Sequence, residues 1–223
     1  GGGGGGGGWW QRVEAGGGST QRDFCAIQRG FLRDHGEEVR RRLKDCLGVP
    51  VELTPAPVSP QVQQRFVHAC KTAEKATTLL RPVYHGTEAK NHRSIFHHGL
   101  LVPGTDSNGN VQVRNGLSHG RGIYTSTVEN PWLSKGFCTQ PRMLVCGVLD
   151  DAVEKATPER IGNFMITKES PSLRHVGAAI VVFDAARVAP LFEAVWRPAA
   201  APPDHSAQQR TAAVAAAAVA GGG

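Results

Sequence analysis

Three short segments of the sequence carry side chains that could hold a flat, polar ligand. They read YHGT at residues 84–87, GRGIYTS at 120–126 and WLSKGF at 132–137. Together they supply an imidazole, hydroxyl groups, two aromatic rings and glycines that let a ligand approach the main chain. A heteroaromatic carboxamide such as nicotinamide needs such groups, because rings can stack on it while amides and hydroxyls hold its polar end. Taken singly, each group also has a structural interpretation in a core or a turn.

In combination, these segments resemble the catalytic domain of ADP-ribosyltransferases of the poly(ADP-ribose) polymerase type. That family carries a His-Gly-Ser/Thr strand end, a helix leading to Gly-Leu, and a Gly-x-Gly-Ile-Tyr segment. Here these read YHGT, SIFHHGL and HGRGIYTS. The similarity continues through WLSKGFC and RMLVCGVL to AAIVVFDAARVAPLF, so it covers about residues 80–196. Because order and spacing both fit, this match is more specific than a single glycine motif.

The resemblance implies that the chain binds NAD in an extended site, with the adenosine half near the first motif. His85 would hydrogen-bond the adenosine ribose, and Thr87 would lie near the same sugar. The polar stretch at residues 103–117 falls where the family has a mobile loop over the donor site. We expect that stretch to become ordered when a ligand binds.

The nicotinamide half of NAD would be held by the other matched residues. Gly86 would bind the carboxamide through its main chain, and Ser134 would offer that group a hydroxyl. Tyr124 and Phe137 would stack on opposite faces of the ring, although the family more often has tyrosine where Phe137 stands. Phenylalanine keeps the stacking surface.

One catalytic position departs from the polymer-forming members of the family. Those members place a glutamate at the start of the last motif strand, where its carboxylate binds the nicotinamide ribose and polarises the acceptor hydroxyl. The alignment puts Ala179 there, while Glu169 lies ten residues upstream and Glu193 fourteen downstream. The resemblance therefore implies transfer of single ADP-ribose units to a protein acceptor with release of nicotinamide, in which His85 and Tyr124 serve the donor site.

Two other functions stay open at this point. A fold can be kept for ligand or partner binding after its chemistry is lost, so an inactive module that binds NAD or ADP-ribose is one alternative. An RNA 2′-phosphotransferase shares the His-Gly-Thr signature and also uses NAD. The GIYTS segment and the pair Ser134 and Phe137 favour the polymerase-like branch.

The predicted fold class is α+β, and the resemblance implies an ADP-ribosyltransferase-like fold of two packed, mostly antiparallel sheets with flanking helices. Glycine-rich residues 1–22 and the Ala/Pro-rich tail at 198–223 cannot build a packed core and are predicted to be disordered. Residues 23–78 are predicted to form a helical amino-terminal part of the domain, and residues 79–197 the catalytic core.

Apolar periodicity and turn residues predict individual elements. A helix at residues 23–47 is expected to bend or break at Gly30 and Gly36, and Ser59 is expected to cap a second helix. Short apolar runs predict strands at 82–84, 122–126, 143–149 and 179–183, and capping signals predict helices at 89–98 and 131–137.

Charge and composition favour a soluble intracellular protein, cytoplasmic or nuclear, without a membrane partner. No run of about 18 apolar residues is present. The formal net charge of +6 makes nucleic acid a weak possibility, because no aromatic residues accompany the basic ones. Five cysteines without a CxxC pair, and histidines at 92, 97, 98 and 119, lack the spacing of a metal site, so no metal is expected.

Overall fold

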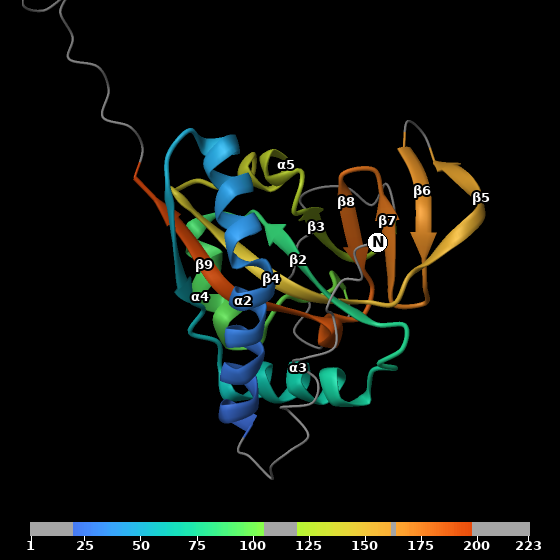
Figure 1. Ribbon diagram of the computed structural model, residues 1–223, viewed down its shortest axis with the longest axis horizontal. Helices are drawn as coiled ribbons and strands as arrows, with labels where there is room; N and C mark the ends of the chain where they lie inside the picture. Colours follow the sequence, from blue (N-terminus) through green and yellow to red (C-terminus); the bar gives the residue numbers. More distant parts are fainter. Residues whose placement is uncertain (1–19, 105–119, 162–163, 198–223) are drawn as a thin grey trace, which may run out of the picture.

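The computed structural model describes residues 20–104, 120–161 and 164–197. The predicted tail at 198–223 and most of the expected loop at 103–117 lie outside these residues. So do residues 1–19 of the predicted amino-terminal segment, whereas Thr20–Arg22 begin the first helix. The described chain combines one large sheet with flanking helices, which confirms the α+β class (Figure 1).

The helices are α2 (Thr20–Leu47), α3 (Pro60–Thr72), α4 (His92–His98) and α5 (Pro131–Lys135), with 3-10 turns η1 (Ala89–Asn91) and η2 (Ala185–Arg187). The strands are β1 (Val51–Pro55), β2 (Leu79–His85), β3 (Ile123–Thr127), β4 (Arg142–Asp150), β5 (Val153–Ile161), β6 (Phe164–Glu169), β7 (Leu173–Val176), β8 (Ala179–Val182) and β9 (Val188–Trp196).

The nine strands form an antiparallel sheet in the order β1-β9-β4-β2-β3-β8-β7-β6-β5. Near the middle of the sheet, two neighbouring strands are joined by few residue pairs. Seven residue pairs join β2 to β4, whereas β2 meets β3 only through Val83 opposite Thr127 and Tyr84 opposite Ser126. We call this short contact the β2–β3 joint. It divides the sheet into a first half, β1-β9-β4-β2, and a second half, β3-β8-β7-β6-β5.

The prediction of two separate packed sheets is wrong, because the β2–β3 joint keeps the hydrogen-bonded ladder continuous. The two halves nevertheless share one apolar cluster on the same face of the sheet. Residues of both halves contribute to it, among them Val83, Ile123, Cys146, Val148, Ile180 and Val182. A sheet of this width must twist and curl to bury such a cluster. A single sheet therefore encloses an apolar core that was expected to lie between two sheets.

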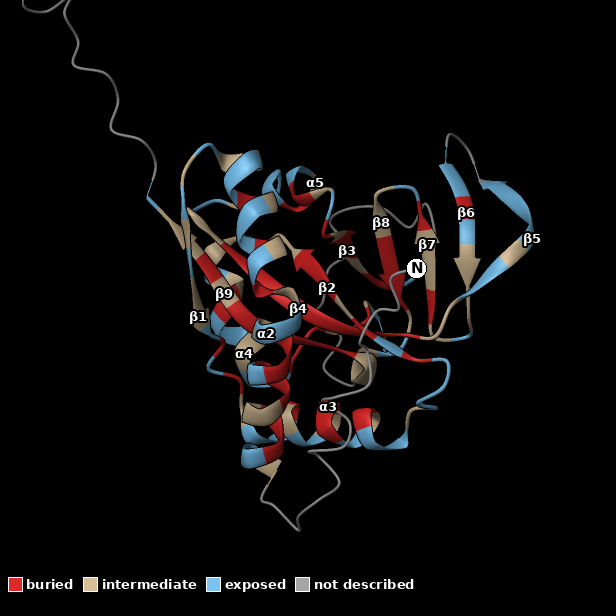
Figure 2. Cartoon of the chain, in the orientation of Figure 1, coloured by how far each residue is buried: buried red, intermediate tan, exposed pale blue. Residues whose placement is uncertain are grey.

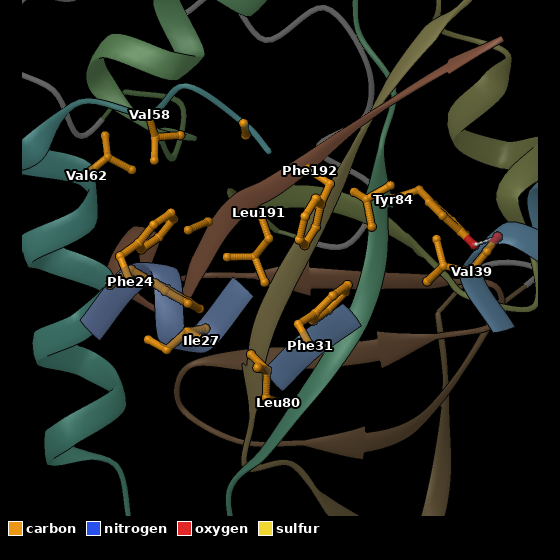
Figure 3. Close-up of a cluster of buried hydrophobic side chains, with 14 of the residues drawn as sticks. Phe24, Ile27, Phe31, Val39, Val58, Val62, Leu80, Tyr84, Leu191 and Phe192 are labelled. Carbon is orange, nitrogen blue, oxygen red and sulfur yellow. Dashed lines mark hydrogen bonds between the residues drawn. The ribbon is translucent and has the colours of Figure 1, made fainter. Parts of the chain in front are cut away.

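The other face of the first half is covered by α2 (Figure 2). The apolar residues of α2 point into this core, where the Phe31 ring stacks on Phe192 of β9 with centroids 5.9 Å apart (Figure 3). Of the bend or break expected at Gly30 and Gly36, the break is wrong, because α2 is continuous and both glycines are buried in it. Burial of its apolar face outweighs the cost of about 1 kcal/mol that a glycine carries inside a helix.

Tyr84 ties the β2–β3 joint to α2. Its side chain is fully buried in the α2 core, and its hydroxyl donates to the Val39 carbonyl of α2 at 3.4 Å (Figure 3). Burial raises the pKa of this phenol, so it remains a neutral donor. The residue before the His-Gly-Thr motif is therefore a structural anchor.

Several predicted elements are confirmed. The four predicted strands correspond to β2, β3, β4 and β8. Ser59 caps α3, since its side chain accepts from the Val62 amide. Gly99 ends α4 with a φ of 85°. Asn130 makes no side-chain cap to α5, and α5 ends at Lys135 and so stops before Phe137.

Strands β5, β6 and β7 were not predicted from the sequence. Strands β5 and β6 form a charged, largely exposed extension at the edge of the sheet, mostly pale blue in Figure 2, whereas the residues of β7 are buried or intermediate. The apolar residues Val153, Phe164 and Met165 are exposed, so they give no alternating pattern of burial. The β5–β6 ladder is also irregular around Pro158, which lacks an amide hydrogen.

A buried carboxylate links the two halves of the sheet at a second point. Asp150, at the end of β4, contacts Arg81 Nε of β2 at 2.5 Å and His175 Nε2 of β7 at 3.0 Å. Burial raises the pKa of Asp150, but the His175 hydrogen bond, the Ala152 amide and Arg81 together bring its net pKa below the ordinary value. The ionised carboxylate therefore stabilises the curled sheet.

We expect Asp150→Asn to lower the free energy of unfolding by about 1–3 kcal/mol at pH 7, the scale of lost hydrogen bonds to a buried charge. Because the folded pKa lies below the unfolded one, this stabilisation exists above about pH 4 and is lost as the pH falls through the folded pKa. Urea denaturation across this pH range measures both effects.

Glu154→Gln is the matched control. Its side chain is 79% exposed and pairs with Lys168 on the surface, so the change should stay under about 1 kcal/mol. Equal losses in the two variants, or a difference that persists at pH 2, would contradict the role given to Asp150.

Candidate functional site

The first motif begins where β2 and β3 separate. Their ladder ends at the pair Tyr84 and Ser126, and the His85 ring takes the next carbonyl of β3, with Nδ1 2.9 Å from the Tyr124 oxygen. A carbonyl only accepts hydrogen bonds, so Nδ1 carries the hydrogen. In the neutral ring, Nε2 therefore presents a lone pair.

The surroundings of His85 favour that neutral form. Burial lowers the pKa of the imidazole, and the nearby His92 lowers it further, while the bond to the Tyr124 carbonyl raises it by less. The net pKa lies below the ordinary value of about 6.5. At neutral pH, His85 can thus accept a hydrogen bond from a hydroxyl.

Gly86 lies directly against α5. A Cβ atom at this position would come within 1.6 Å of the Ser134 carbonyl oxygen, closer than any side chain allows. The main-chain amide and carbonyl of Gly86 have no hydrogen-bond partner in the part of the chain that the structure describes. The close approach explains the glycine and leaves one main-chain donor and one acceptor for a ligand.

Ser134 of α5 is joined by hydrogen bonds to both β2 and β3. Its Oγ donates to the Tyr84 carbonyl at 2.8 Å and lies 2.8 Å from Oγ of Ser126. Both serines are buried, with 4% exposure for Ser134 and 1% for Ser126. Sequence reasoning did not identify Ser126 as part of the site, because only the fold brings it to Ser134.

The two aromatic rings lie on β3 and just after α5, near the elements that this serine pair connects. Tyr124 is half-buried on β3, two residues before Ser126 and therefore on the same face, and its hydroxyl donates to the Gly120 carbonyl at 3.0 Å. Phe137 follows α5 and is 43% exposed. The Phe137 side chain is thus accessible to solvent, while the Tyr124 hydroxyl is held by a hydrogen bond.

Thr87 and Cys138 lie beside this group. The Thr87 hydroxyl accepts from the Asn91 side-chain amide at 2.9 Å, which holds the turn before η1. Cys138 Sγ lies 3.6 Å from the Ser134 carbonyl oxygen, and burial is the main cause that raises the pKa of its thiol to about 11. A neutral thiol is a poor nucleophile, so Cys138 contributes packing here.

Ala179 begins β8 directly opposite Ser126 of β3. Residues paired in this way point to the same face with Cβ atoms about 4.5–5.5 Å apart. The methyl group of Ala179 therefore lies on the face that carries Tyr124 and Ser126. It can neither accept a proton nor bind a hydroxyl.

Neither neighbouring glutamate reaches that position. Glu169 is held by Lys155 at 3.0 Å and by Arg174. Glu193 of β9 pairs with Leu144, which pairs with His85, so it points to the opposite face from Ala179. Neither Glu169 nor Glu193 therefore supplies a carboxylate beside Ala179.

Glu193 instead belongs to a buried pair that the sequence did not reveal. Its Oε1 lies 2.7 Å from His92 Nδ1 and 3.4 Å from an Arg142 nitrogen. His92 is 3% exposed, and its Nε2 has no hydrogen-bond partner among the described residues. The residues are 101 positions apart, so no local signal could have joined them.

No protein-family model and no curated protein matches this chain. Among the described residues, no set of three His, Cys, Asp or Glu side chains is arranged to hold a metal ion. His119 of the histidine set considered in the sequence lies outside them. None of the described helices has the length and apolar character needed to cross a membrane.

We expect Gly86→Ala to destabilise the fold by about 1–3 kcal/mol, the usual cost of overpacking, because α5 must move away from β2. Thermal or urea unfolding measures the loss. Gly136→Ala is the control, since its new methyl group would meet its nearest atom at 3.6 Å in helical backbone. If both variants are as stable as the wild type, Gly86 is not needed for the contact with α5.

Proposed function

We propose that this chain binds NAD and transfers single ADP-ribose units from it to protein acceptors, with release of nicotinamide. The observation that carries the proposal is the convergence of the three motifs. His85 Nδ1 bonds the Tyr124 carbonyl, and Ser134 bonds the Tyr84 carbonyl while contacting Gly86. Segments up to 50 residues apart along the chain thus lie in contact, which supports the proposal.

The adenosine half of NAD would lie against the first motif. A neutral His85 with its hydrogen on Nδ1 offers the Nε2 lone pair to a ribose hydroxyl. Thr87 would lie near the same sugar, positioned by its bond to Asn91. His85 acts here as a binding group and not as a general base.

The nicotinamide half would lie between β3 and α5. The unpaired main-chain groups of Gly86 suit the carbonyl and amino groups of a carboxamide. Tyr124 lies on β3 and Phe137 just after α5, the two elements that Ser126 and Ser134 connect. Their stacking on the two faces of the pyridine ring is part of the proposal.

Transfer would begin with cleavage of the bond between the nicotinamide nitrogen and the ribose carbon. The bonding electron pair leaves with neutral nicotinamide, and the cationic ribose carbon is captured by an acceptor side chain, which gives up its proton. Positioning supplies most of the rate enhancement in such chemistry. Since Ala179 cannot take that proton, the acceptor or solvent must do so.

The same alanine favours a second candidate function. Without a carboxylate at position 179, the chain could bind NAD or ADP-ribose as a recognition module and catalyse no transfer. Incubation with labelled NAD, followed by mass spectrometry of the protein and added acceptors, separates the two. Bound but intact NAD would establish the module.

Tyr124→Ala should weaken benzamide binding by about 1–3 kcal/mol, because benzamide mimics nicotinamide and would lose one stacking face. Calorimetry measures the affinity. Trp132→Ala is the control, since this indole on α5 is 59% exposed and has no place in the stack. Unchanged benzamide affinity in a folded Tyr124 variant would rule out the stacking role.

His85→Ala should reduce NAD affinity about tenfold, the scale of one lost hydrogen bond in a buried site, while leaving benzamide binding nearly unchanged. His97→Ala is the matched control, because this histidine is exposed on α4. The opposite pattern, with benzamide binding lost and NAD binding kept, would show that His85 does not serve the adenosine half of NAD.

Products should carry single ADP-ribose units, because elongation requires a carboxylate that polarises an incoming ribose hydroxyl. Electrophoresis and mass spectrometry of wild-type protein incubated with NAD measure product length. Ala179→Glu tests the same position, although a new buried charge costs stability. Ladders made by the wild type and trimmed by a poly(ADP-ribose) glycohydrolase would refute the role given to Ala179.

A further inference from the structure

A row of side chains on one face of the sheet leads from the first motif to a buried carboxylate. His85 of β2 pairs with Leu144 of β4, and Leu144 pairs with Glu193 of β9. Residues paired in this way point to the same face of a sheet. The apolar cluster on this face includes Leu144, and Ile95 and Phe96 of α4 pack against it. Helix α4 therefore lies over a row that has His85 at one end and Glu193 at the other.

The turn after His85 connects the two ends of this row. Residues 86–91 follow β2, and α4 then begins at His92. His92 Nδ1 lies 2.7 Å from Glu193 Oε1, and both side chains are largely buried, with exposed fractions of 4% and 13%. We call this contact the His92–Glu193 pair. It joins the far end of the turn to β9, while β2 holds the near end.

The same turn carries Thr87, which in the proposed function lies near the adenosine ribose. Thr87 accepts a hydrogen bond at 2.9 Å from the side-chain amide of Asn91, the residue immediately before His92. The His92 amide in turn donates to the Ala89 carbonyl and closes η1. These bonds connect Thr87 to His92 through a short stretch of chain. A shift of His92 would therefore be transmitted to Thr87.

The stability of the fold does not account for a polar pair at this position. Taking an imidazole and a carboxylate out of water is costly, and apolar side chains of similar size often stabilise a protein equally well. His92 Nε2 also has no hydrogen-bond partner among the described residues, which adds to the cost. Arg142 lies 3.4 Å from Glu193, but its side chain is 40% exposed, so this contact adds little. The pair instead fixes where His92 lies, because a buried hydrogen bond specifies one arrangement of its partners.

We propose that His92 and Glu193 are positioning residues, which hold the Thr87 turn where the adenosine half of NAD requires it. This inference rests on the proposed NAD-binding function and adds two residues that none of the three motifs contains. Both residues act through the turn, and neither touches the ligand.

The test compares the affinity for NAD with the affinity for benzamide, because only NAD reaches Thr87. Benzamide depends on Gly86, which has its own contact with Ser134 of α5. Glu193→Leu should weaken NAD binding about fivefold, because a displaced Thr87 loses much of one hydrogen bond, and should leave benzamide binding unchanged. Calorimetry measures both affinities. Glu52→Leu is the matched control, since this glutamate is exposed on the neighbouring strand β1 and should change neither affinity.

Two further variants separate positioning from stability. The double variant His92→Leu with Glu193→Leu removes both polar groups, so it should unfold near the wild-type temperature and still bind NAD more weakly. His92→Asn keeps a donor near the position of Nδ1, so it should keep the wild-type affinity for NAD. A folded double variant that binds NAD as tightly as the wild type would overturn the inference. So would a loss of NAD affinity in His92→Asn as large as that in His92→Leu, and this comparison decides even if the double variant does not fold.

The same measurements distinguish this inference from the proposed function. Wild-type protein that binds neither NAD nor benzamide would refute the donor site and the inference with it. Wild-type protein that binds both, with an NAD affinity that does not respond to loss of the His92–Glu193 pair, would refute only the positioning role. A parallel loss of both affinities in Glu193→Leu would indicate a general disturbance of the fold and would also contradict that role.

Discussion

The β2–β3 joint is the contact on which the proposed site depends. Its two residue pairs keep the halves of the sheet in one ladder, and the strands separate immediately after Tyr84. That separation releases the Tyr124 carbonyl to His85 and brings Gly86 against α5. A longer ladder would have used the same main-chain groups for the sheet, so the short joint makes them available for a ligand.

So short a joint needs support from both faces of the sheet. On one face, Tyr84 is buried beneath α2 and bonded to the Val39 carbonyl. At the other end of the strands, Asp150 connects β2 and β4 to His175 of β7. The Tyr84 contact fixes β2 against α2, and the Asp150 contact restrains the relative position of the two halves.

The sequence allowed prediction of the central strands, because their signals are local. Continuous apolar runs marked β4 and β8. The Ser126–Ser134 contact depends on how β3 faces α5, and the pair of Glu193 and His92 on strand register, so neither could be predicted locally. The charged strands β5 and β6 lacked an apolar pattern because most of their residues are exposed, and β7 has only four residues, with Leu173 and Val176 buried at its ends.

The two edge strands of the sheet have a consequence for the behaviour of the protein at high concentration. An exposed edge offers unpaired main-chain groups to a second chain and so invites aggregation. At one edge β5 carries Pro158 and the ion pair of Lys155 with Glu159, and at the other β1 ends at Pro55. Proline interrupts the row of main-chain N–H donors, and charged side chains repel a second copy of the same strand. Both edges therefore carry features that oppose fibril growth.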